Sequence, residues 1–248
     1  MVEIEIEDAR FWKSCVDAIV NLIEEGTFEI NSDGINLRAM DPSQIAMVIF
    51  SVPKSAFVKY EVSSPAKVSV NLNNLAKILS RVRNKEKLVM SLEENKLALQ
   101  FTSPKGKRSF NIPLIDMPPG HQKEPKIEHD ASVVIEGGAF KEILRDAALI
   151  SSHLTLKASS DGFEVDAHGD SADLKVESEK TGEGVKEIKA TKEAKATFPL
   201  QYLEDISKSC SDSDTLTASI KTNAPIKITY KVGEASLTYY LAPRIDSD

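Results

Sequence analysis

Residues 32–43 read SDGINLRAMDPS, and residues 160–171 read SDGFEVDAHGDS. The two stretches share five of their twelve columns without a gap: Ser, Asp, Gly, Ala and Ser. Their offset is 128 residues (160 minus 32), which is about half of the 248-residue chain. Because Asp-Gly between alternating apolar residues signals a tight turn, each stretch predicts two strands joined by a hairpin-like turn.

The sequence on both sides of the repeated stretch also matches itself, at offsets of 128 or 129 residues. The further matches are Phe11…Asp17-Ala18 with Phe140…Asp146-Ala147, Leu72-x-x-Leu75 with Leu200-x-x-Leu203, residues 88–92 with 216–220, and Phe110-x-Ile112 with Tyr239-x-Leu241. Chance similarity explains one such match better than five in the same order, so we infer an internal duplication. A period of this length is that of a whole domain and not of a solenoid repeat.

Between the two copies lies DMPPGHQKEPKIEHD, residues 116–130. Its three prolines and its polar side chains predict an exposed, stiffened linker. The expected domains are therefore residues 1–115 and 131–248. Each copy shows short alternating strands and two stretches with apolar residues at helical spacing, at 9–23 and 73–82 and at 139–150 and 200–208. The predicted fold class is α+β, with antiparallel sheets and two helices in each domain.

Composition excludes several classes of protein. The chain is 41% apolar and 28% charged, which is ordinary for a globular protein with two cores. The N-terminal MVEIEIED alternates apolar and acidic residues, a strand pattern and not a signal peptide, and no run reaches the roughly 20 apolar residues of a membrane span. Two cysteines make neither a disulfide framework nor a metal motif, which indicates a reducing, intracellular protein.

Catalytic motifs are missing from the sequence. It contains no G-x-x-x-x-G-K-[ST], no H-E-x-x-H and no G-x-S-x-G, so we expect neither a catalytic residue nor a cofactor. Asp166, His168 and Asp170 would share one face of a strand and could hold a divalent metal. A polar strand end and turn explains them better, and the spacing of a calcium loop is not met. A metal-dependent hydrolase is therefore kept only as an alternative.

Positive charge is placed on the helices although the net charge is −7. Each predicted helix carries Lys or Arg opposite its apolar stripe: Arg10 and Lys13, then Lys77, Arg81 and Arg83, then Lys141 and Arg145, and then Lys208. Any solvated helix face looks similar. If the four helices lie on one side of the sheets, however, their charges add up to a basic surface, while the acidic balance lies elsewhere.

Four segments resemble one known family. They are residues 34–48 (GINLRAMDPSQIAMV), residues 71–79 (NLNNLAKIL), Phe198-x3-Tyr202-Leu203 and the terminal YLAPRID at 240–246. Together they resemble the sliding clamps of the proliferating cell nuclear antigen family, in its archaeal form, over essentially the whole chain. The resemblance implies the DNA-clamp fold, in which one subunit is two copies of a domain of sheets and two helices. Three subunits, identical or different, then close head to tail into a ring around duplex DNA.

The resemblance also implies which residues act. The helices would line the hole and make weak contacts with DNA that are independent of base sequence. Lys13, Lys77, Arg145 and Lys208 match basic channel positions of the family, and Arg81, Arg83 and Lys141 are additions on the same faces. Such a clamp is not an enzyme. It works with the DNA inside the cell, in the cytoplasm of an archaeon or the nucleus of a eukaryote.

Partner enzymes of the family bind a pocket through a peptide that carries a glutamine and aromatic anchors. The partners implied are the clamp loader, DNA polymerase, flap endonuclease and DNA ligase. The pocket positions here are Met40, Gln44, Ile45, Met47, Ile127, Pro225, Tyr240, Leu241, Ala242 and Pro243. The linker departs from the family pattern, because it offers only Met117 and Ile127 where leucines or isoleucines are usual.

The ring implies a seam between subunits. We expect the sheet edge at 107–112 to pair with the edge at 174–178 of the next subunit, with Phe110, Ile112, Leu174 and Val176 at the contact. A specialised clamp of the checkpoint type, acting in damage signalling, is the alternative within the same class; the intact LAPRI terminus argues against it.

Overall fold

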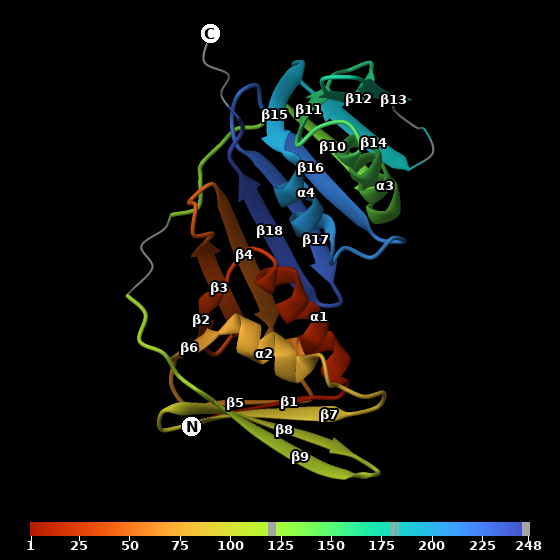
Figure 1. Cartoon of the computed structure of the whole chain (residues 1–248). Helices are drawn as coiled ribbons and strands as arrows, with labels where there is room; N and C mark the ends of the chain where they lie inside the picture. The colour runs from red at the N-terminus through yellow and green to blue at the C-terminus, as the bar shows by residue number, and fades with distance from the viewer. Residues whose placement is uncertain (119–122, 180–181, 183, 245–248) are drawn as a thin grey trace. The chain divides into compact units, whose positions relative to one another are not determined.

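The computed structural model of the chain describes residues 1–118, 123–179, 182 and 184–244. The chain forms two compact units (Figure 1). Unit 1 comprises Met1–Pro42, Val48–Gln122 and Val232–Leu237. Unit 2 comprises Ser43–Met47, Lys123–Lys231 and Thr238–Asp248. Antiparallel sheets and two helices recur along the chain, so the predicted α+β class is confirmed.

Unit 1 contains two sets of paired strands. One sheet has the strand order β5-β1-β7-β8-β9, and the other strands follow the order β4-β3-β2-β6. The bounds are β1 Val2–Ile6, α1 Ala9–Val20, β2 Glu25–Ile30, β3 Gly34–Met40, β4 Ala46–Pro53, the 3₁₀ turn Lys54–Ala56, β5 Lys59–Val62, β6 Ala66–Asn71, α2 Leu72–Leu79, β7 Lys87–Glu93, β8 Lys96–Ser103 and β9 Gly106–Pro113.

Unit 2 repeats this order strand for strand. Its orders are β14-β10-β16-β17-β18 and β13-β12-β11-β15, so β10 takes the place of β1 and β11 that of β2. The bounds are β10 Ala131–Glu136, α3 Gly137–Ala148, β11 His153–Ala158, β12 Gly162–His168, β13 Asp173–Glu179, β14 Val185–Ala190, β15 Ala194–Pro199, α4 Leu200–Ser207, β16 Thr215–Ile220, β17 Ile226–Val232 and β18 Ala235–Leu241. The duplication read from the sequence is therefore visible as a repeated topology.

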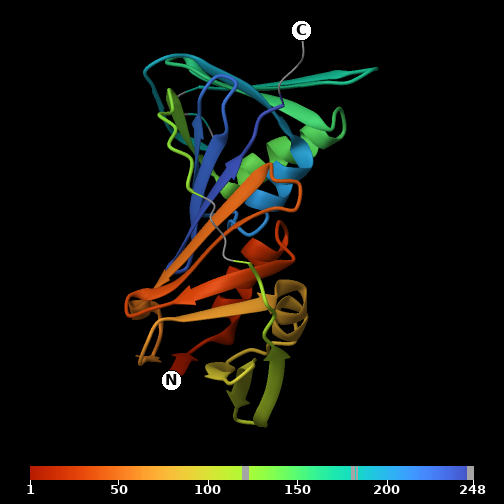
Figure 2. The same cartoon turned by 90° about the vertical axis from the view of Figure 1, so that its left-hand side faces the viewer.

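Each helix begins where the sequence provides a start signal or a strand ends. The Asp8 side chain accepts the Arg10 N–H at 3.0 Å and caps α1, and Asn71 accepts the Asn74 N–H at 2.9 Å and caps α2. In unit 1, α1 packs against α2 (Figures 1 and 2), and in unit 2, α3 packs against α4. The apolar stripe of α1 is buried, with Trp12 packed against aromatic side chains of β2 and β4.

Unit 1 differs from the prediction in both of its helices and in one strand. The first helix ends at Val20 and not at residue 23. The second helix ends at Leu79 and not at residue 82, because the Ser80 hydroxyl donates to the Lys77 carbonyl at 2.7 Å and the chain then turns. Strand β5 was not predicted, since KYEV is short and half polar. It forms because it pairs with β1, where Lys59 lies between Glu3 (2.6 Å) and Glu61 (3.2 Å). Within the described part of the chain, no helix is long and apolar enough to cross a membrane.

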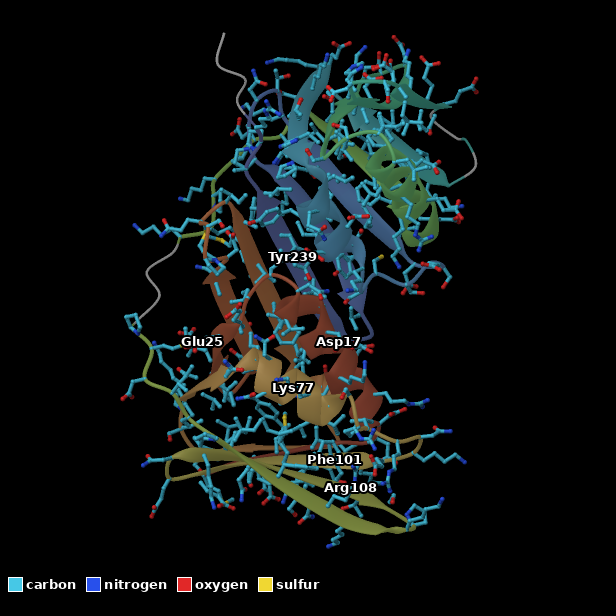
Figure 3. The ribbon with its side chains drawn as sticks, viewed as in Figure 1. Asp17, Glu25, Lys77, Phe101, Arg108 and Tyr239 are labelled. Carbon is cyan, nitrogen blue, oxygen red and sulfur yellow. The ribbon has the colours of Figure 1, made fainter. Side chains whose placement is uncertain are left out.

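A buried ion pair holds the turn after α2 to the five-stranded sheet. Glu86 is only 2% exposed, and its carboxylate accepts from Arg108 on β9 at 2.6 Å and from the Arg83 N–H at 2.8 Å. The Arg108 guanidinium also lies 5.3 Å from the centre of the Phe101 ring and 5.9 Å from that of Phe110. Figure 3 shows Arg108 beside Phe101 on this sheet. One carboxylate therefore fixes both the turn and the side chains of the β9 edge.

Replacing Glu86 with alanine should lower the free energy of unfolding by about 2 kcal/mol or more, because it leaves a half-buried guanidinium without its counter-charge. Urea unfolding at one protein concentration measures the loss. Glu93→Ala is the matched control, because Glu93 pairs with Lys96 on the surface at 3.1 Å, and its loss should stay within about 0.5 kcal/mol. Equal losses in the two variants would contradict the structural role given to Glu86.

Candidate functional site

In unit 1 the predicted DNA-binding cations lie on both helices and on the turn after the second. Lys13 on α1 forms an ion pair with Asp17, one helical turn further on. Lys77 is exposed on α2 (Figure 3). Arg81 and Arg83 are exposed as well, but they follow the end of α2. The prediction that these two arginines share a helix face with Lys77 is therefore wrong, because both lie in the turn after the helix.

In unit 2 one of the three predicted cations is held by its own chain. Lys141 on α3 donates to the Asp212 carboxylate at 2.8 Å and to the Cys210 carbonyl at 2.5 Å, and only 16% of its side chain is exposed. The Lys141 ammonium lowers the pKa of the Asp212 carboxyl below its ordinary value. Arg145 in the last turn of α3 and Lys208 at the end of α4 are exposed.

The seven predicted cations thus fall into two groups. Two of them, Lys13 and Lys141, are neutralised by carboxylates of the same unit. The others are exposed and form no ion pair within the described residues: Lys77, Arg81, Arg83, Arg145 and Lys208. Exposed cations of this kind contact phosphates weakly and in a salt-dependent way, because water and ions screen them.

Most of the predicted partner-binding residues gather in unit 2, where the short stretch 43–47 meets the end of the chain. The Ile45 carbonyl accepts the Ala242 N–H at 2.8 Å, so these two segments run side by side. Ile45, Pro225, Ala242 and Pro243 are half-buried. Together with Tyr240 they are called the C-terminal surface below. Apolar side chains with a proline rim suit the aromatic anchors of a short peptide.

The remaining predicted partner-binding residues are placed differently. Gln44 is exposed and adopts a left-handed backbone conformation with φ of 61°. Met47 is 5% exposed and Leu241 has no exposed area, so both belong to the core beneath the surface. Met40 is half-buried in unit 1, at the end of β3, and Ile127 is half-buried in the linker.

Tyr240 is buried although it belongs to this surface, with 5% of the residue exposed. Its hydroxyl donates to Glu124 Oε1 at 2.8 Å. Lys227 on β17 lies 5.7 Å from the ring centre and 4.0 Å from the same carboxylate oxygen. Burial, and then the hydrogen bond to Glu124, raises the pKa of the Tyr240 hydroxyl well above its ordinary value. We call Tyr240, Lys227 and Glu124 the linker clasp; neither Glu124 nor Lys227 was predicted from the sequence.

Hydrogen bonds at or next to each described end of the linker join it to its own unit. In unit 1, the N–H groups of Leu114 and Ile115, just before the linker, donate to the carbonyls of Asn95 (2.9 Å) and Ser69 (3.0 Å). These residues border a groove of about 990 Å³ on the face of β2, β3 and β6, which sequence reasoning missed. In unit 2, the Lys221 ammonium donates to the carbonyl of Glu128 at 3.1 Å.

His129 fastens the same end of the linker in unit 2. Its Nε2 lies 3.2 Å from the Pro225 carbonyl oxygen. Burial, with a further contribution from Lys227 and Lys221, lowers the pKa of His129 below its ordinary value of 6.5. The ring is therefore neutral at pH 7 and donates this hydrogen bond through Nε2–H.

The two predicted seam segments are edge strands in the described structure. β9 is the last strand of its five-stranded sheet, and β13 is the last strand of its four-stranded sheet. On β9, Phe110 is half-buried with its ring 5.8 Å from Phe101, and Ile112 is 3% exposed. On β13, Leu174 and Val176 are half-buried and alternate with exposed polar residues. Both edges therefore combine free backbone groups with an apolar row.

Asp166, His168 and Asp170, the predicted metal ligands, do not form a metal-binding cluster in the described residues. There, no group of three or more His, Cys, Asp or Glu side chains is arranged to hold a metal ion. His168 Nδ1 instead lies 2.8 Å from Asp173 on the neighbouring strand β13.

The comparisons with known proteins point in one direction. The family model for the N-terminal domain of proliferating cell nuclear antigen matches residues 1–118, and that for its C-terminal domain matches residues 123–245. The chain belongs to the proliferating cell nuclear antigen family. The resemblance noted in the sequence is thus confirmed, and the two family models match the two copies of the duplication.

Relatives in this family are named for one activity. The chain is 37% identical to the DNA polymerase sliding clamp of Methanococcus vannielii over 97% of its own length and 98% of the relative's. It is 32% identical to the clamp of Thermococcus gammatolerans, over 98% of each chain. Curated relatives of this clamp family therefore match nearly from end to end.

Solved structures of the family have the same fold. PCNA from Thermococcus kodakaraensis aligns with a TM-score of 0.94 and 26% identity, over 98% of this chain and all of that one. A. fulgidus PCNA, solved with the C-terminal region of FEN-1 bound, aligns with a TM-score of 0.91 and 27% identity over the whole of both chains. The clamp fold with two repeated domains is thus confirmed.

Proposed function

We propose that this chain is a DNA polymerase sliding clamp, that three copies close into a ring around duplex DNA, and that the ring tethers replication and repair enzymes without catalysing a reaction. The observation that carries the proposal is the repeated topology, in which β9 ends a sheet of unit 1 and β13 ends a sheet of unit 2. Edge strands of seven or eight residues attract further strands. Two different edges on one chain give a head-to-tail contact, which closes into a ring.

The exposed cations of the helices and of the turn after α2 fit the DNA side of this proposal. A ring that is linked topologically to DNA needs no affinity to stay on it, and strong phosphate binding would slow its sliding. The five exposed cations offer weak contacts that do not depend on base sequence. The net charge of −7 disfavours binding of DNA elsewhere on the molecule.

The C-terminal surface fits the partner side of the proposal. Its half-buried apolar residues and its two prolines suit a short peptide, and A. fulgidus PCNA, a protein of the same fold, was solved with the C-terminal region of FEN-1 bound. We propose that the clamp loader, DNA polymerase, flap endonuclease and DNA ligase dock here through a peptide with a glutamine and aromatic anchors. Because every such partner presents one short peptide, one surface serves them all in turn.

The seam is tested by replacing Phe110 with alanine. The variant should shift the assembly from trimer toward monomer at low micromolar concentration, because it removes an apolar anchor at the β9 edge. Sedimentation velocity measures the shift. The matched control is Tyr60→Ala, which truncates an aromatic side chain on β5, the opposite edge strand of the same sheet. If the Phe110 variant sediments like the parent, β9 is not the edge that joins the subunits.

The partner surface is tested with Ile45→Arg and Pro243→Ala. Both should weaken a synthetic glutamine-aromatic peptide, Ile45→Arg by at least about tenfold, because a charge would sit without a partner in an apolar site. The ring should stay intact. Calorimetric titration gives the affinities, and Val58→Arg, at an exposed apolar residue of unit 1, is the control. Unaltered affinity in both surface variants would move the partner site elsewhere.

The channel is tested by changing Lys77, Arg81, Arg145 and Lys208 to alanine together. The ring should still form, but its stimulation of a DNA polymerase on primed DNA should fall, and the deficit should shrink as salt rises. The loss should be the same for different template sequences. Removing four exposed lysines elsewhere, Lys54, Lys105, Lys195 and Lys231, keeps the charge change equal and should have a smaller effect. Equal stimulation by all three proteins at every salt concentration would end the channel assignment.

A further inference from the structure

The burial of Tyr240 runs against the pattern of its own strand. Side chains of β18 alternate, and Ala235, Leu237, Tyr239 and Leu241 all point into the core, with 0 or 1% exposed. The side chains between them face outward, and accordingly Ser236 is exposed and Thr238 half-exposed. Tyr240 also faces outward by this alternation, yet it is 5% exposed. Something on the outer face therefore covers it.

Two described groups of the linker clasp contact Tyr240 on this outer face. Glu124 reaches the hydroxyl from the linker, and Lys227 approaches the ring from the outward row of β17. Hydrogen bonds at Glu128 and His129 fix the linker to unit 2 a few residues after Glu124. These bonds keep the Glu124 carboxylate close to Tyr240. A polar contact thus does on this chain what apolar linker residues would do by packing.

The chemistry of the covered place is specific. A buried hydroxyl that donates to a carboxylate makes a charge-assisted hydrogen bond, which is stronger than one between neutral groups. The Lys227 ammonium stands 4.0 Å from the same oxygen and adds a favourable charge. When Glu124 leaves, the Tyr240 hydroxyl loses its acceptor and the Lys227 ammonium loses a nearby counter-charge, so a ligand that uses the aromatic ring must supply both. A carboxylate is the acceptor that satisfies both groups at once.

We propose that Tyr240 and Lys227 form a carboxylate seat in the partner surface, which Glu124 of the linker fills in the free chain and which an acidic side chain of the partner peptide fills in the complex. This inference rests on the proposed function, because it assumes that partner peptides dock at the C-terminal surface. It adds a preference that the resemblance does not supply: an Asp or Glu close to the aromatic anchors. It also means that Glu124, a residue of this chain, competes with the acidic side chain of the peptide for the seat.

The competition has a size that can be measured. A tethered carboxylate competes at an effective concentration in the millimolar range. One net hydrogen bond changes an affinity by roughly three- to tenfold. Glu124→Ala should therefore raise the affinity for an acidic peptide about three- to tenfold. Glu128→Ala is the matched control. It removes a second exposed carboxylate of the linker that is not part of the linker clasp, so the affinity should change little.

The decisive experiment compares peptide pairs on the assembled ring. Glutamine-aromatic peptides carry a single glutamate at successive positions around the aromatic pair, each with a glutamine counterpart, and calorimetry gives the affinity of every peptide for the parent and the variants. At one position at least, glutamate should bind three- to tenfold better than glutamine to Glu124→Ala. Lys227→Met and Tyr240→Phe, each combined with Glu124→Ala, should shrink that preference, since each removes one group of the seat.

The outcomes separate this inference from the function on which it rests. If all peptides bind but glutamate and glutamine are equivalent everywhere, or if Glu124→Ala binds more weakly than the parent, the seat is wrong and the partner surface stands. If no peptide binds the parent or any variant, the partner surface itself is wrong, and the seat falls with it. Amide hydrogen exchange at residues 123–130 gives an independent check: it should speed up when an acidic peptide binds, and unchanged or slower exchange would count against displacement of the linker.

Discussion

β9 and β13 end their sheets without a further strand within the described residues, so each offers a row of backbone N–H and C=O groups to another chain. A duplicated domain would make these edges equivalent if both copies were used alike. Here they are not equivalent, because β9 belongs to the first copy and β13 to the second copy's other strand set. A head and a tail therefore arise from one repeated unit, and any ring built from the chain has a direction.

The cations follow from the same repetition. Each copy places two helices after equivalent strands, and Lys or Arg lies on or just after each of these helices. The structure then divides these charges by their neighbours. Lys141 forms an ion pair with Asp212 and Lys13 forms one with Asp17, whereas Lys77 and Arg145 face solvent. This smaller set of exposed charges fits the proposed channel, in which weak contacts with phosphates allow sliding.

The sequence was sufficient where a pattern is local. The 3.6-residue stripe predicts α1 and α3 within a few residues, and the alternation of apolar side chains predicts β9 and β13 as strands. It failed where a tertiary contact decides. β5 exists because it pairs with β1, and the turn that follows α2 is held to β9 by the ion pair of Glu86 with Arg108. Such contacts join residues far apart in the chain, which periodicity does not report.

The C-terminal surface shows the same difference between local patterns and long-range contacts. Ile45 and Pro243 could be assigned from a motif, because they stand in or beside quoted stretches, but the bond from Tyr240 to Glu124 spans 116 residues and joins the terminus to a linker with no pattern. From the sequence, a polar linker does not look like part of a binding surface, since the resemblance implies leucine or isoleucine side chains there. In the folded chain the Glu124 carboxylate of this linker accepts the hydrogen bond of the buried Tyr240. On the proposal that partner peptides dock at the C-terminal surface, this carboxylate favours partners that bring both an aromatic anchor and an acid, which is a narrower demand than apolar fit alone.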